Sequence, residues 1–92
     1  MMRLCSLEVT RLEAELSKAV EAILFVAEAP LSADELTKIL GVKPAEVEFA
    51  LEELGERLSQ GSGLQLVRIA GGYQLCTRPE MAEAVSLYLK PQ

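Results

Sequence analysis

The chain has 92 residues, which is enough for one domain and too few for two. Half of the residues are hydrophobic but only 4% are aromatic, so a single core has to be built mainly from Leu, Val, Ile and Ala. Nine basic against fourteen acidic residues give a net charge of -5. This charge opposes binding to a phosphate backbone unless the few basic residues gather on one face.

Neither a targeting signal nor a membrane span is predicted. Residues 1–11 contain no apolar stretch like the core of a signal peptide. The longest uninterrupted apolar run, residues 22–27, is far too short to cross a membrane. Cys5 and Cys76 have neither the spacing of metal ligands nor the density of a disulfide scaffold. We therefore expect reduced thiols in a cytoplasmic protein.

The first predicted helix covers residues 12–28. Thr10 and Glu13 have the spacing of a capping box at its start, and apolar residues recur along it at helical spacing. Residues 1–11 precede this helix as an N-terminal extension.

A second helix is predicted over residues 33–40. Ser32 and Glu35 have the spacing of a capping box at its start, and Gly41 is expected to end it in a left-handed conformation.

A third helix is predicted over residues 44–59, after a very short turn. Pro44 fits its first position. Its inward stripe is expected to consist of Val47, Ala50, Leu51, Leu54 and Leu58.

The pattern then changes to that of a β-hairpin. Two extended runs, residues 64–70 and 73–77, flank Gly71 and Gly72. We expect both glycines to have positive φ, which glycine adopts without strain, and to serve the turn rather than a ligand. Replacing either glycine with Val is expected to destabilise the domain by about 1–3 kcal/mol.

A last helix is predicted over residues 79–89, with four residues facing inward: Met81, Ala82, Val85 and Leu89. The order is then helix, helix, short turn, helix, hairpin, helix. It is typical of a winged helix-turn-helix, a mainly α fold with a small β-hairpin as its wing. We assign residues 12–90 to this domain.

The residue types that usually carry catalysis are scarce. The chain has no histidine, which is the commonest general base and metal ligand. The many glutamates lie opposite the apolar stripes of the predicted helices, as expected of a solvated face. Residues 61–63 form a Gly-Ser-Gly loop without the lysine of a phosphate-binding loop. We predict no catalytic residue, no metal site, no cofactor and no small-molecule substrate.

The third helix argues against DNA reading. Winged-helix proteins often place this helix in the major groove, where Arg, Lys, Asn or Gln side chains read the bases. Here residues 44–59 contain five glutamates and one base, Arg57, which leaves a charge of -4. In the predicted wing, Arg68 and Arg78 are too few to offset it.

Several large apolar residues exceed what one small core needs. Phe49 lies off the stripe of the third helix, so either another element of the domain covers it or it contacts a partner. A contiguous apolar patch on a monomer would mark an interaction site, which a twofold dimer would cover most simply. The candidate dimer or partner contacts are Leu4, Leu7, Phe49, Leu87 and Tyr88.

Three stretches of the sequence resemble one bacterial family. The stretches contain EAILFVA at 21–27, PLS at 30–32, EL at 35–36 and LGV at 40–42, then EV at 46–47 and ALEEL at 50–54, then LVRIAGGYQL at 66–75 and TRPE at 77–80. Over residues 16–89 this combination resembles the N-terminal half of the segregation and condensation protein B family.

The resemblance implies a protein with two winged-helix domains, of which this chain holds only the first. It implies a non-enzymatic scaffold that joins a kleisin subunit (ScpA) and the structural-maintenance-of-chromosomes (SMC) ATPase in the bacterial condensin. It further implies homodimerisation of the first domain, a role in chromosome condensation and segregation, and a cytoplasmic location at the nucleoid. The alternative from another class is a DNA-binding transcriptional regulator, against which the acidic third helix argues.

Overall fold

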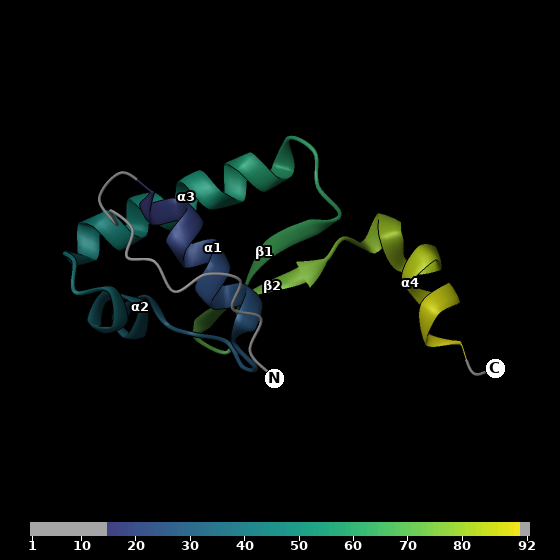
Figure 1. Cartoon of the computed structure of the whole chain (residues 1–92), viewed down its shortest axis with the longest axis horizontal. Coiled ribbons are helices and arrows are strands. Elements are labelled where there is room, and N and C mark those ends of the chain that lie inside the picture. Colours follow the sequence, from purple (N-terminus) through teal and green to yellow (C-terminus); the bar gives the residue numbers. More distant parts are fainter. Residues whose placement is uncertain (1–14, 91–92) are drawn as a thin grey trace.

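A computed structural model describes residues 15–90 of the chain (Figure 1). The elements in chain order are α1 (Leu16–Val26), α2 (Ala33–Leu40), α3 (Pro44–Ser59), β1 (Leu64–Ile69), β2 (Gly72–Thr77), the 3-10 turn η1 (Pro79–Met81) and α4 (Ala82–Leu89). This is the winged helix-turn-helix order that the sequence predicts. Of the helices described here, none is both long and apolar enough to span a lipid bilayer.

Local signals set the bounds of α2 and α3. The Ser32 hydroxyl accepts a hydrogen bond from the Glu35 backbone N–H at 3.1 Å, and the Glu35 carboxylate accepts one from the Ser32 N–H at 2.8 Å. Gly41 ends α2 with φ of 68°. The predicted capping box and left-handed stop are therefore confirmed, as are both predicted helix ranges.

The core lies between the three helices and is closed by the wing. All five residues predicted as the inward stripe of α3 are buried, together with Val20 and Leu24 of α1 and Leu36 of α2. The hairpin packs against this cluster through half-buried Leu66, Tyr73 and Leu75. Leu, Val and Ala thus supply the whole buried core, as the low aromatic content requires.

The first helix ends earlier than the predicted residue 28. Ala27 is extended, with ψ of 140°, because the chain must reach the wing. There the Leu31 N–H donates to the Tyr73 carbonyl at 3.0 Å, and the Tyr73 N–H donates to the Leu31 carbonyl at 2.7 Å. The predicted helix start at residue 12 and the capping signal of Thr10 and Glu13 lie outside the described residues.

The prediction that Gly72 is a turn residue with positive φ is wrong. The two turn residues are Ala70, with φ of 51°, and Gly71, with φ of 76°. Gly72 instead begins β2, buried and paired with Ile69. A Cβ on Gly72 would lie 3.0 Å from the Leu31 carbonyl carbon and 3.0 Å from the Pro30 Cβ. Position 72 therefore requires glycine because residues 30 and 31, which lie against it, leave no room for a side chain. A positive φ is not the reason.

The inward face predicted for α4 is wrong. None of Met81, Ala82 and Leu89 is buried, and Val85 is only half-buried. Among the described elements, α4 packs extensively only against η1, the turn that leads into it. Figure 1 shows α4 beyond the end of the wing, well away from the layer of α1, α2 and α3.

Candidate protein-binding surfaces

The first candidate surface is α4, which presents large apolar side chains to solvent. Leu87 is 69% exposed, Tyr88 86% and Leu89 70%. They come from a helix that is apolar along most of its length and has no buried residue. Isolated helices of this length are marginal in water, and α4 buries none of its residues against the rest of the described chain. A group of exposed apolar side chains of this kind marks an interaction site.

Two opposite charges flank this surface. Glu83 and Lys90 are seven residues apart, two helical turns, on either side of Leu87. All three line one shallow hollow of about 490 Å³ on α4, together with Ser86 and Leu89.

The second candidate surface is a groove between α1 and α3, and Phe49 is one of the residues that line it. The groove has a volume of about 550 Å³. Leu16 of α1 and Ala45, Phe49 and Ala50 of α3 supply its apolar lining, and Phe49 is 66% exposed. The sequence left two interpretations of Phe49 open. Within residues 15–90, no other element buries this side chain.

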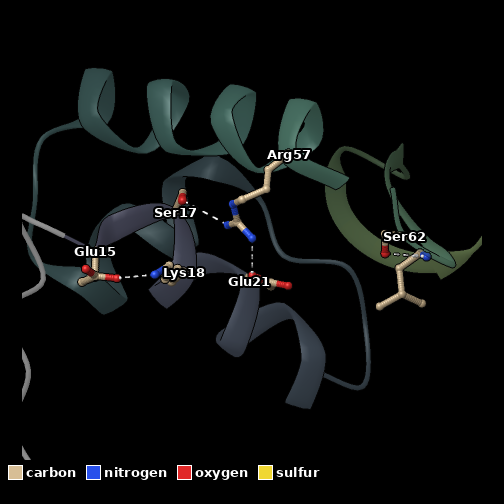
Figure 2. Close-up of polar contacts among 7 residues, drawn as sticks. Glu15, Ser17, Lys18, Glu21, Arg57 and Ser62 are labelled. Atoms are coloured by element: carbon tan, nitrogen blue, oxygen red, sulfur yellow. Dashed lines mark hydrogen bonds and ion pairs between the residues drawn. The ribbon is translucent and has the colours of Figure 1, made fainter. Parts of the chain in front are cut away.

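The remainder of the lining is polar: the uncharged Ser17 and the charged Glu15, Lys18, Glu46, Glu53 and Arg57. The Lys18 ammonium lies 3.1 Å from the Glu15 carboxylate. The Arg57 guanidinium donates to the Glu21 carboxylate at 3.0 Å and to the Ser17 hydroxyl at 3.1 Å, which ties α3 to α1 (Figure 2). Within residues 15–90, Glu46 and Glu53 form no ion pair, so the groove keeps a negative charge.

The two arginines of the wing, Arg68 and Arg78, make contacts within the domain. The Arg78 guanidinium donates to the backbone carbonyls of Leu58 and Ser62, both at 3.1 Å, and thereby holds the end of the wing to the end of α3. The Arg68 guanidinium lies 5.6 Å from the centre of the Tyr73 ring, across the hairpin. Together with Arg57, these arginines do not form a basic face that could offset the glutamates of α3.

The predicted contact residues do not form one patch. Leu87 and Tyr88 lie on α4, whereas Phe49 lies in the groove between α1 and α3, so they belong to two separate surfaces (Figure 1). Leu4 and Leu7 lie outside the described residues. Glu83 and Lys90 were not among the predicted contact residues, although their spacing around Leu87 was an available signal. Among residues 15–90 no three or more His, Cys, Asp or Glu side chains could together hold a metal ion.

The chain is similar in sequence to proteins of a known family. Residues 18–92 match the model of the family described as segregation and condensation complex subunit ScpB. Segregation and condensation protein B of Moorella thermoacetica is 46% identical over 78 residues, which cover 84% of this chain and 40% of that protein. The protein of the same name from Myxococcus xanthus is 43% identical over 76 residues, covering 79% of this chain and 23% of that one. The chain thus spans less than half the length of these relatives.

Solved structures share the fold. A crystal structure of a dimer of the ScpB N-terminal domain complexed with an ScpA peptide superposes with a TM-score of 0.76 at 30% identity, covering 82% of this chain and 95% of that one. ScpB from Mycobacterium tuberculosis superposes with a TM-score of 0.77 at 28% identity, covering 89% of this chain and 51% of that one. The winged-helix class predicted from the sequence is confirmed.

Proposed function

Because this chain belongs to the family of segregation and condensation complex subunit ScpB, we propose that it is a non-enzymatic scaffold domain of the bacterial condensin. In this role it would self-associate, bind the kleisin subunit ScpA, and thereby act with the SMC ATPase in chromosome condensation and segregation. It would work in the cytoplasm, held at the nucleoid through the complex. The observation that carries the proposal is the exposed apolar surface of α4, on a domain whose third helix is acidic.

The surface of α4 is best covered by a second copy of the chain. A related N-terminal domain crystallised as a dimer, and a twofold axis lets one apolar surface cover its own equivalent. Burying Leu87 and Tyr88 in such a contact would remove apolar area that the monomer leaves in water.

The charges on α4 indicate an antiparallel arrangement of the two helices. Glu83 and Lys90 lie on opposite sides of a point between Ser86 and Leu87. If the twofold axis passes near that point, Glu83 of each copy faces Lys90 of the other, and the two Leu87 side chains meet at the centre. Such paired opposite charges fix register and orientation more than they add affinity.

Kleisin binding is tested most simply with the full chain and the ScpA subunit of the same organism. We expect the mixture to elute from a gel-filtration column as a complex larger than either protein alone. Elution of two separate, unshifted peaks at micromolar concentration would contradict the scaffold role of this domain.

The alternative, a DNA-binding regulator, predicts the opposite behaviour toward nucleic acid. We expect the chain to show no useful affinity for a short fluorescent duplex at about 50 mM salt, where counterion release most favours binding. The physical reason is the net charge of -5 and the five glutamates of α3. Fluorescence anisotropy measures this directly, and a low-micromolar dissociation constant would support the regulator instead.

A further inference from the structure

We propose that the groove between α1 and α3 binds a basic segment of a partner protein, one that carries an apolar anchor side chain for the surface around Phe49. The proposal rests on the proposed scaffold function and specifies where its peptide partner docks. It assigns a protein-binding role to the helix that DNA-binding winged-helix proteins use to enter the major groove.

The apolar part of the groove supplies the anchor site. Phe49 is 66% exposed on a helix whose other large apolar residues are buried, and Leu16 and Ala50 lie beside it in the groove. A large aromatic side chain beside a hollow is typical of the residues that dominate binding energy in protein interfaces. Two helices flanking an open groove suit an amphipathic partner segment that lays its apolar side chain between them.

The charge of the groove specifies a basic partner. Lys18 is paired with Glu15, and Arg57 is paired with Glu21, so the two basic groups of the lining are already compensated within the domain. Glu46 and Glu53 also line the groove and form no ion pair among the described residues, although the Glu46 carboxylate accepts a hydrogen bond from the Lys43 N–H at 2.9 Å. Three further glutamates of α3 add to the negative potential. The same field that repels a phosphate backbone attracts lysine and arginine side chains.

The test uses fluorescently labelled overlapping peptides that tile the ScpA subunit of the same organism, titrated with the full chain. We expect the tightest peptide to carry Lys or Arg next to a large apolar residue. Its affinity should fall at least tenfold with Phe49→Ala, because the variant removes the central anchor. Glu53→Gln should weaken binding about threefold at about 50 mM salt and have little effect at about 500 mM, where the charge is screened.

Two matched controls isolate the groove from the rest of the surface. Ile39→Ala removes an exposed apolar side chain from α2, and Glu52→Gln removes the same charge from α3 outside the groove. Both should leave the affinity of the peptide within twofold of that of the unmodified chain. Circular dichroism melting of every variant checks that the fold is intact, which the exposure of these side chains favours.

The other outcomes overturn the proposal in distinguishable ways. If a peptide binds but the groove variants and the controls bind it equally well, the groove is not the site, while the scaffold function stands. If no ScpA peptide and no intact ScpA binds, the proposed function fails together with the groove. If deletion of residues 1–14 lowers the melting temperature as much as Phe49→Ala, and the two changes together lower it no further, the groove holds the chain's own N-terminal segment instead.

Discussion

Replacing Leu87 with Asp is expected to convert the dimer into a monomer. Leu87 is 69% exposed on α4 and would lie at the centre of the proposed contact. A twofold interface contains the substitution twice, so two carboxylates would face each other in an apolar environment. We expect the dissociation constant to rise more than a hundredfold, equivalent to about 3 kcal/mol. Light scattering during gel filtration of a dilution series measures the change.

Two further variants test whether dimerisation depends on this particular contact or on exposed apolar side chains in general. Ile39→Asp places the same charge on another exposed apolar position, 57% exposed on α2, and should leave the dimer unchanged. The second variant tests the antiparallel arrangement, in which Glu83 of each copy faces Lys90 of the other. Glu83→Lys alone should weaken the dimer because like charges then face each other, and adding Lys90→Glu should restore it. Failure of the second change to rescue the first would exclude the antiparallel pairing, although not the use of α4.

Replacing Gly72 with Val is expected to have the largest effect on folding. The added Cβ would meet the backbone of Leu31 and the side chain of Pro30 at about 3.0 Å, and the backbone held by the Leu31–Tyr73 bridge cannot give way cheaply. We expect a loss of about 2–3 kcal/mol in the free energy of unfolding, typical of overpacking. This corresponds to a fall of about 10–20 °C in melting temperature for a domain of this size.

Gly71→Asn is the matched control for this prediction. Gly71 has φ of 76°, and nothing lies within 4 Å of the position where its Cβ would stand. Asn tolerates the left-handed region better than other residues with a side chain, so the loss should stay below about 1 kcal/mol. Thermal unfolding at one fixed protein concentration compares the two variants without interference from dimerisation. A Gly72→Val variant as stable as Gly71→Asn would mean that the contact with residues 30 and 31 is absent.

The parts of the fold that local chemistry determines could be predicted from the sequence. The bounds of α2 follow from a capping box and a glycine stop, both of which act within a few residues. The buried stripe of α3 follows from helical periodicity alone. The role of Gly72 and the segment after α1 both involve the bridge between Leu31 and Tyr73, which no local pattern reports because it joins residues far apart in the sequence.

The two candidate surfaces were harder to predict from the sequence than the helix bounds and the buried stripe of α3. An apolar helix face has the same pattern whether its own domain or a second copy covers it, so periodicity assigned α4 to the core. Only the position of α4 beyond the wing separates the two cases. The groove is lined by residues of both α1 and α3, and no local pattern reports how two helices lie relative to each other. The sequence did name Phe49, Leu87 and Tyr88 as candidate contact residues, while leaving open that another element of the domain covers Phe49, and all three are exposed.

The central claim is that this winged-helix domain self-associates through α4 and serves as a protein-binding scaffold. Sedimentation equilibrium on the unmodified chain, from micromolar to millimolar concentration, tests it most directly. We expect the mass to approach twice the chain mass of 10.0 kDa as the concentration rises. A mass that stays at that of one chain across the whole range would contradict the account, because the apolar surface of α4 would then have no second copy to cover it.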